Sequence, residues 1–301
     1  MMTESYYSTE YGKMHLSSIE KFYESEEGQA LKGKINLIFT SPPFPLKRKK
    51  SYGNFNGIDY LTWMKYVSTI LSEFLTEDGS IVIEMGNAWE CGQPTFSTLP
   101  IEALLEFKRS SNLYLCQEFI HHNPSRLPTP IEWVNKRRIR VKDSFTRIWW
   151  LSKCTNPKAN NRKILVPYSK SMKKLLSTTN YNSGLRPSEH VIGSSSFNND
   201  NGGAIPSNVL IASNTSAKDL YLDYCKSYNL PIHPARMAKE IPEFFIRFLT
   251  EKNDLVLDPF SGSNTTGFVA EQLGRNWVSI EENTSYFEGS KGRFSNIFMA
   301  E

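Results

Sequence analysis

The feature that most constrains the fold is a strand–turn–helix–strand unit in the last quarter of the chain. The sequence Asp-Leu-Val-Leu-Asp at 254–258 predicts a buried strand, and a glycine-bearing turn leads from it into a helical segment at 267–273. A second strand is predicted at 277–280 and ends at Glu281. Because two strands joined by a helix lie parallel in one sheet, the unit predicts an α/β fold.

The turn of this unit has the composition of a nucleoside-binding loop. It reads Asp-Pro-Phe-Ser-Gly-Ser-Asn-Thr-Thr-Gly over 258–267. Gly262 lets the backbone approach a ligand, and the amides and hydroxyls of 263–266 stand at a helix N-terminus. Glu281, 23 residues after Asp258, is placed to accept both hydroxyls of a ribose. Neither GxGxxG nor GxxxxGK[ST] is present, which disfavours dinucleotides and triphosphates; an ordinary strand–turn–helix is the alternative.

A second motif, Ser41-Pro42-Pro43-Phe44, directly follows an apolar strand predicted at 35–40. Neither proline can donate to a strand ladder, so the strand ends there and a carbonyl oxygen is free to face a cleft. Ser41 adds a hydroxyl and Phe44 a flat face. Such a segment can hold the exocyclic amine of an unstacked base, although a Pro-Pro turn alone is common.

The rest of the chain extends the α/β pattern and interrupts it once. Further strands are predicted at 80–85, after a turn at Asp78-Gly79, and at 146–151, with helices at 59–75 and 238–250. Pro242 is difficult to place inside the last helix. Residues 154–230 are polar and rich in Ser and Asn, which predicts a smaller domain or large insertion.

Positive charge is concentrated in one part of the chain. The sequence carries 35 Lys and Arg against 31 Asp and Glu, a net charge of +4. Residues 121–170 alone contain twelve Lys or Arg against two acidic residues, and a second basic cluster occupies 47–50. Such clustering is typical of proteins that contact a polyanion, since each cation displaces a counterion from phosphate. A solvated charged surface is the alternative.

Cysteine usage and hydropathy exclude several classes. Cys91, Cys116, Cys154 and Cys225 form no CxxC pair, so the sequence predicts buried reduced thiols and no metal site. Neither an apolar run of about 18 residues nor a secretory signal is found. We therefore expect a cytoplasmic protein without a membrane segment.

Together, the Ser-Pro-Pro-Phe and Asp-Pro-Phe-Ser-Gly-Ser motifs resemble those of the amino-methylating DNA methyltransferases that use S-adenosylmethionine. Their order is similar to that of the circularly permuted β class. The segment from His233-Pro234 through 241–246 resembles the family's stretch before the cofactor loop. The resemblance implies a mostly parallel doubly wound sheet with a smaller target-recognition domain. It divides the chain into a catalytic half at 1–153, a target-recognition region at 154–230 and a cofactor-binding half at 231–301.

The resemblance narrows to the cytosine-N4 members and covers most of the chain. The stretches that carry it are 52–54, 123–128, 131–137, 140–143, 186–188, 200–206 and 263–267. It implies methyl transfer to the N4 amine of a cytosine flipped out of duplex DNA, with S-adenosylhomocysteine as product. It also implies the modification enzyme of a type II restriction-modification system, with CAGCTG as its recognition sequence. A cognate endonuclease would act on the same site without forming a stable complex with the protein.

The same resemblance implies a role for each candidate residue. The catalytic residues would be Ser41, Pro42, Pro43, Phe44 and Glu84. The cofactor contacts would be His233, Pro234, Asp258, Pro259, Phe260, Gly262, Ser263, Asn264, Thr265, Thr266 and Glu281. The DNA contacts would be Lys47, Arg48, Lys49, Arg126, Lys136, Arg137, Arg138, Arg140, Lys142 and Arg186.

Two departures from the family pattern stand out, and two alternative functions stay open. Glu84 stands where an Asp is expected near the active site, and Gly12-Lys13 replaces a Gly-Asp that contacts the adenine side. One alternative is an adenine-N6 methyltransferase, although Ser at the first position of the tetrapeptide favours cytosine. The other is a DNA-binding protein that has lost catalysis, against which both motifs are intact.

Overall fold

The computed structural model describes residues 6–44, 57–178, 183–193, 199–214 and 219–295. The basic cluster at 47–50, with Lys47, Arg48 and Lys49, and the stretch 52–54 lie outside the described residues. Contacts divide the chain into two compact units, one formed by 1–159 with 208–301 and the other by 160–207.

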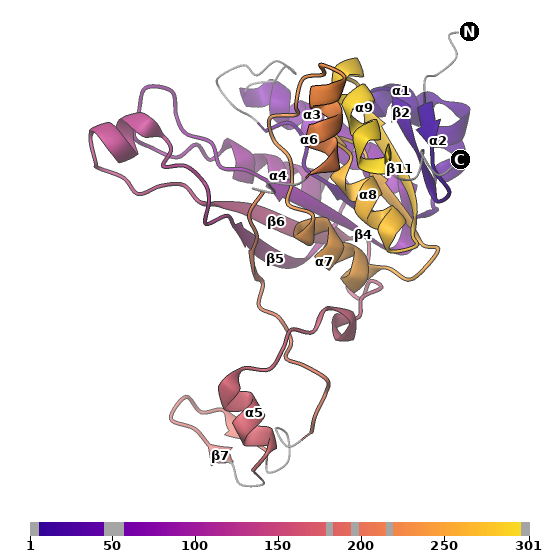
Figure 1. Cartoon of the computed structure of the whole chain (residues 1–301). Coiled ribbons are helices and arrows are strands. Elements are labelled where there is room, and N and C mark those ends of the chain that lie inside the picture. Colours follow the sequence, from indigo (N-terminus) through magenta and orange to yellow (C-terminus); the bar gives the residue numbers. More distant parts are fainter. Residues whose placement is uncertain (1–5, 45–56, 179–182, 194–198, 215–218, 296–301) are drawn as a thin grey trace. The chain divides into compact units, whose positions relative to one another are not determined.

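The larger unit is built on a nine-stranded mixed sheet in the order β1-β2-β11-β10-β3-β4-β6-β5-β9 (Figure 1). The strands are β1 (Tyr6–Ser8), β2 (Gly12–Leu16), β3 (Ile35–Thr40), β4 (Leu75–Met85), β5 (Tyr114–His122), β6 (Phe145–Ser152), β9 (Val209–Ile211), β10 (Leu255–Asp258) and β11 (Asn276–Glu281). From β2 to β4 all neighbours are parallel, whereas β6 runs antiparallel to both β4 and β5. The mostly parallel α/β sheet is therefore confirmed.

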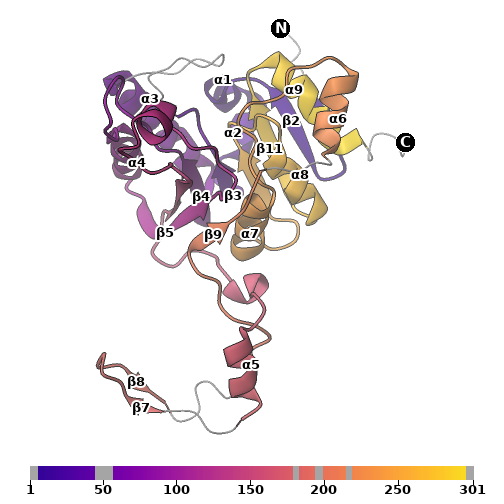
Figure 2. The same cartoon turned by 60° about the vertical axis from the view of Figure 1, so that its left-hand side comes forward.

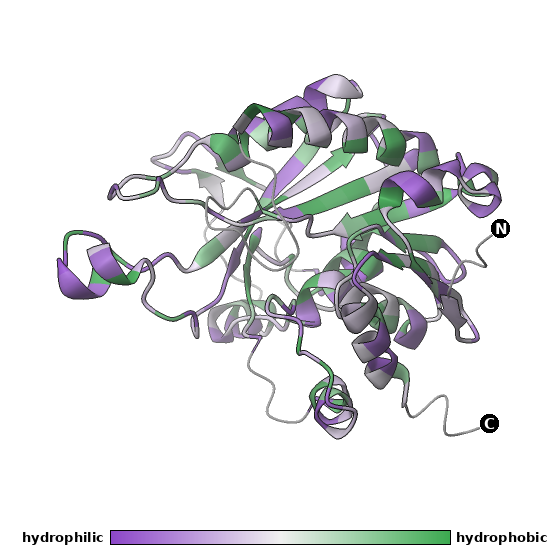
Figure 3. Cartoon of the chain, turned by 90° about the horizontal axis from the view of Figure 1, so that it is seen from above, coloured by the Kyte–Doolittle hydropathy of each residue, from purple (hydrophilic) through white to green (hydrophobic). Residues whose placement is uncertain are grey.

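Helices cover both faces of this sheet because its strands are apolar on both sides. The helices of the unit are α1 (Ile19–Glu24), α2 (Glu26–Leu31), α3 (Gly57–Phe74), α4 (Leu99–Ser110), α6 (Leu220–Ser227), α7 (Glu240–Leu249), α8 (Thr265–Gln272) and α9 (Thr284–Ser290). In β3, Ile38 packs in a core with α1, α3 and α4, and its neighbours Leu37 and Phe39 pack in a second core with α7, α8 and α9. Figure 3 shows green, hydrophobic stretches in strands of the sheet.

One predicted strand begins earlier than expected, and the position of Pro242 inside a helix has a structural explanation. The strand expected at 80–85 runs from Leu75, because pairing with β3 shifts register and accommodates Asp78-Gly79 as an irregularity inside the strand rather than a turn before it. Pro242 is accommodated in α7 because it lies in the first turn, where its missing N–H would have no partner within the helix.

The smaller unit is described by itself. It contains the 3-10 turn η2 (Asn161–Ile164), helix α5 (Lys170–Leu176) and a ribbon of β7 (Gly184–Leu185) with β8 (Val191–Ile192) (Figure 2). It is narrower than the target-recognition region expected at 154–230, because β9 pairs with β5 and α6 packs on α9 in the larger unit. The recognition role of this region stays a prediction.

Three further observations concern classes of site. Of the four cysteines, none is disulfide-bonded; Cys225 is buried as expected, but Cys91 is exposed and the other two are partly exposed. In the part of the chain that the structure describes, no helix is long and apolar enough to cross a membrane. Over those same residues, no cluster of three His, Cys, Asp or Glu side chains could hold a metal ion.

Candidate active site

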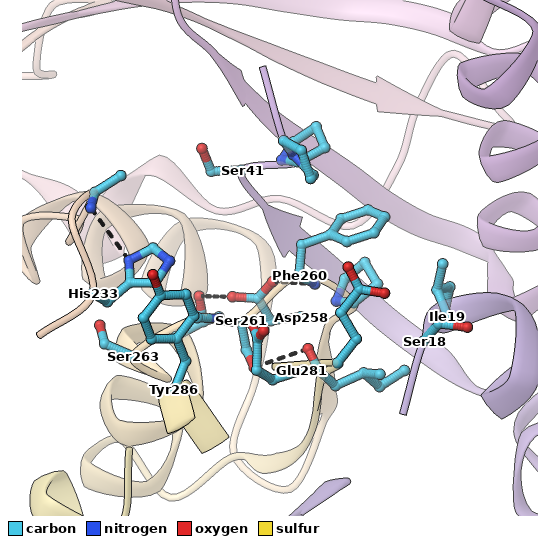
Figure 4. A pocket seen from close by; sticks show the side chains of 18 of the residues that line it. Ser18, Ile19, Ser41, His233, Asp258, Phe260, Ser261, Ser263, Glu281 and Tyr286 are labelled. Carbon is cyan, nitrogen blue, oxygen red and sulfur yellow. Dashed lines mark hydrogen bonds between the residues drawn. The ribbon is translucent and has the colours of Figure 1, made fainter. Parts of the chain in front are cut away.

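The carboxyl ends of β3, β10 and β11 open into one cavity of about 580 Å³. The two motifs, 218 residues apart at Thr40 and Asp258, lie side by side because β3 and β10 are hydrogen-bonded neighbours. The cavity is lined by the corner Ser41–Phe44, by most of the 258–266 loop, by His233 and by Glu281 (Figure 4). Parallel strands direct such loops to one edge of the sheet, where ligands of open α/β folds bind.

Asp258 joins the two motifs. Its Oδ1 accepts hydrogen bonds from the Thr40 hydroxyl (2.8 Å) and the Phe260 amide (3.2 Å), and its Oδ2 accepts one from the Thr266 hydroxyl (2.6 Å). Burial raises the pKa of this carboxyl from 3.8 to about 6, against the opposing effect of these three donors. The carboxyl therefore ties β3, the loop and the start of α8 together.

The loop after β10 is shaped by two residues with positive φ. At Gly262 (φ 51°) an added Cβ would stand 2.9 Å from Nε2 of His233, so glycine is needed there. Asn264 (φ 54°) is fully buried and caps α8, where its Oδ1 accepts from the Gly267 amide and the Ser279 hydroxyl. Asn264 does not line the cavity. It shapes the loop, and its expected cofactor contact stays a prediction.

Glu281 is fixed at the end of β11. Its Oε2 accepts from the Gly262 amide (2.8 Å) and its Oε1 from the Asn283 amide (2.9 Å). Burial raises the pKa of this carboxyl from 4.5 to about 7. Each oxygen keeps a lone pair, so the side chain can accept further hydrogen bonds at the cavity wall.

Aromatic side chains also contribute to the cavity wall. The His233 ring packs edge-on against Tyr286, with centroids 4.6 Å apart, and Trp63 packs against Phe260 at 5.4 Å. All four of these residues line the cavity, whereas Pro234, the neighbour of His233, does not. The rings therefore offer flat apolar surface to a ligand, and the expected cofactor contact of Pro234 stays a prediction.

The Ser41–Phe44 corner is held by two contacts. The Tyr60 hydroxyl on α3 donates to the Pro43 carbonyl (2.9 Å), so that carbonyl is already engaged within the protein. The Phe44 ring lies so close to Gly86 that an added Cβ there would stand 2.4 Å from Cε2 of the ring. Gly86 therefore leaves the space that Phe44 occupies.

A family model described as "DNA methylase", of the N6 and N4 type, matches residues 35–292. The chain belongs to this DNA methylase family.

Individual DNA methylases agree with this assignment. The type II methyltransferase M.PvuII of Proteus hauseri is 43% identical over 297 residues, 98% of this chain and 87% of that protein. A solved PvuII DNA methyltransferase, titled cytosine-N4-specific, superposes with a TM-score of 0.76 at 36% identity, covering 97% of this chain and 92% of that one. A Thermus thermophilus protein titled "Putative DNA Modification Methylase" and complexed with S-adenosyl-L-methionine shares the fold (TM-score 0.56, 17% identity, 94% and 93% covered).

Glu84 lies outside the cavity lining of this DNA methylase. Its Oε1 accepts from the Thr146 hydroxyl (2.6 Å) and contacts Nδ1 of His121 (2.8 Å), whose Nε2 lies 3.2 Å from the Ala212 carbonyl oxygen. Burial alone would lower the pKa of His121, but the hydrogen bond and charge of Glu84 outweigh it and the pKa is raised. Glu84 thus belongs to a buried pair that links β4, β5 and β6, and its chemical role stays a prediction.

Most of the expected DNA contacts lie on one segment, residues 123–144, which we call the arm. It joins the end of β5 to the start of β6 and so leaves the same edge of the sheet as the cavity. Its basic residues are Arg126, Lys136, Arg137, Arg138, Arg140 and Lys142. Arg186 lies in the smaller unit, beside the turn between β7 and β8.

Several cavity residues were not identified from the sequence. Tyr60 and Trp63 have the helical spacing of core residues, so nothing in the sequence indicated that they also line the cavity. Met237 and Tyr286 line it as well, but they belong to no recognisable motif. Residues 17–20 could have been found, since they follow β2 at the same sheet edge. The departure from the family pattern at Gly12-Lys13 does not change the cavity wall, because these two residues begin β2 and do not line the cavity.

Proposed function

We propose that this DNA methylase transfers a methyl group from S-adenosylmethionine to the N4 amine of a cytosine flipped out of duplex DNA. The observation that carries the proposal is the single cavity shared by the Ser41–Phe44 corner and the 258–266 loop. The choice of cytosine over adenine rests on the likeness to the PvuII enzyme, titled cytosine-N4-specific, and on Ser41 at the first position of the corner.

The cavity fits the cofactor. Its volume of about 580 Å³ lies within the range of roughly 300–1,000 Å³ that is typical of small-molecule sites. Glu281 offers acceptors for the ribose hydroxyls, Gly262 leaves room for the His233 ring that lines the cavity, and Phe260 with Trp63 offers aromatic surface. S-adenosylmethionine supplies an electrophilic methyl group there.

The corner residues make the target amine a better nucleophile. The cytosine N4 lone pair is delocalised into the ring, and hydrogen bonds from the amine to the Ser41 hydroxyl and to a main-chain carbonyl of the Pro42-Pro43 segment favour a pyramidal nitrogen. Tyr60 takes one lone pair of the Pro43 carbonyl and leaves the other, so either carbonyl of this segment can accept from the amine. Phe44 stacks on the base, and holding the reacting atoms in line contributes up to about 7–11 kcal/mol.

Duplex binding offsets the unstacking of the base, which costs roughly a few kcal/mol. In this proposal, the basic residues of the arm contact phosphates of the duplex. Residues 1–153 and 231–301 would form the catalytic and cofactor halves, and the region 154–230 would read the sequence. The protein would act in the cytoplasm beside an endonuclease of the same specificity.

The test combines labelling with analysis of the product. Duplex DNA is incubated with the purified protein and tritiated S-adenosylmethionine, and its nucleosides are then identified by mass spectrometry. We expect N4-methylcytosine, and loss of labelling in Ser41→Ala and Phe44→Ala but not in the exposed control Ser110→Ala. N6-methyladenine alone would favour the adenine alternative, and a gel shift without labelling would favour a DNA-binding protein. Methylation-sensitive sequencing reads the context, for which we expect CAGCTG.

A further inference from the structure

The arm carries apolar side chains that phosphate contacts do not explain. Leu127 is 75% exposed and Val141 is 86% exposed, and Ile131 is also exposed. They lie among the six basic residues of the arm, which carries only Glu132 and Asp143 as acids. Exposed apolar side chains that share one basic segment fit a partner that offers both phosphates and apolar surface, as a DNA duplex does with its backbone and its bases.

The foot of the arm stands next to the catalytic corner. Asn87 directly follows Gly86, against which the Phe44 ring packs. The Asn87 amide donates to Asp143 of the arm (2.8 Å) and to the Phe145 carbonyl at the start of β6 (3.1 Å). A duplex whose base occupies the cavity beside Phe44 would therefore meet the arm close to the position that the base has left.

The arm is braced rather than a loose loop. Backbone hydrogen bonds join its two limbs, from Asn123 to Ser144 (2.8 Å) and from Asp143 to Thr129 (3.1 Å). The Arg140 guanidinium donates to a backbone carbonyl of the loop after β4 (3.0 Å). A hairpin that is held by these hydrogen bonds can keep its side chains in place between stacked bases.

We propose that Leu127 and Val141 form a wedge that enters the base stack and occupies the space from which the target base is flipped. Apolar side chains inserted at a base step are covered by the faces of the bases, while neighbouring cations hold the backbone. The inference rests on the proposed function, because it requires a base that leaves the duplex.

The experiment uses two duplexes that differ only opposite the target cytosine, one with a paired guanine and one with an abasic position. For the double variant Leu127→Ala/Val141→Ala we expect kcat/KM to fall by at least about tenfold on the paired duplex. On the unpaired duplex, whose target is already free, we expect it to stay within about twofold of wild type. Fluorescence of 2-aminopurine placed next to the target cytosine rises when that cytosine leaves the stack, and on the paired duplex it should rise less with the double variant than with the wild-type protein.

Two control variants sharpen the result. Lys136→Ala should lower kcat/KM by the same factor on both duplexes, since a phosphate contact does not depend on whether the target base is paired. Tyr66→Ala, 47% exposed on α3, should change neither. An equal loss on both duplexes, or no loss on either, would overturn the wedge with the proposed function intact. If the wild-type protein methylates neither duplex, the proposed function itself fails.

Discussion

In the proposed function, the carboxyl group of Glu281 couples cofactor binding to proton concentration. Both of its oxygens are held by backbone amides, yet burial raises its pKa to about 7. Its folded-state pKa lies above the value of 4.5 expected for an exposed Glu. The cofactor-free protein therefore loses stability from this group as the pH rises from 4.5 to about 7.

The affinity for S-adenosylmethionine, in contrast, should rise as the pH rises. The ionised carboxylate accepts ribose hydroxyls best, so we expect binding at pH 6 to be about tenfold weaker than at pH 8. Isothermal titration calorimetry across this range provides the measurement. Asp258, Glu282, Glu20 and His233 also line the cavity. The matched variant Glu281→Gln should therefore bind more weakly and lose this pH dependence; an unchanged dependence would assign it to one of those groups.

At the scale of elements, the site depends on how β3 and β10 are joined. The Thr40 hydroxyl of β3 donates to Asp258 of β10, and both residues are buried. A buried carboxyl that loses a donor keeps its desolvation cost, so this bond fixes the spacing of the two motifs.

Replacing Thr40 with Val keeps the shape of the side chain and removes the donor. We expect the free energy of unfolding to fall by about 1.5–3 kcal/mol, measured by urea denaturation. The control is Thr69→Val on the exposed side of α3, whose hydroxyl donates to the Lys65 carbonyl of the same helix and should contribute little. Equal effects of the two substitutions would contradict a special role for the Thr40–Asp258 bond.

The sequence predicted β3, β10 and the shared position of the loops that follow them. Strands 35–40 and 254–258 are short apolar runs ended by Pro-Pro and by a Gly-bearing loop, so local chemistry marks both their nature and their ends. Glu84 was harder to interpret, because its partners His121 and Thr146 come from two other strands. Tyr60 carries a purely helical pattern, and only the tertiary structure shows its bond to Pro43.

At the scale of the whole molecule, the chain separates a large catalytic unit from a small one at 160–207. The small unit contains six Lys or Arg against Glu189 and Asp200. The rest of the chain is therefore close to neutral overall, since the net charge of the protein is +4. This distribution is consistent with a DNA-contacting role for the small unit.

Replacing residues 160–207 with a flexible Gly-Ser linker should separate cofactor binding from sequence-specific methylation. Because the residues that line the cavity all belong to the large unit, we expect the affinity for S-adenosylmethionine to stay within about twofold of wild type. Sequence-specific methylation should be lost. Calorimetry and methylation-sensitive sequencing of the same variant measure both, and retained specificity would assign recognition to the arm instead.

The strand order also bears on when the protein becomes active during its synthesis. β10 and β11 insert between β2 and β3, although they are made more than two hundred residues later. Before β10 and β11 are made, the inner edges of β2 and β3 therefore lack their partners, and the parallel centre of the sheet cannot form. A chain that terminates before β10 lacks both the middle of the sheet and the 258–266 loop of the cavity, so we expect it to be unable to methylate DNA.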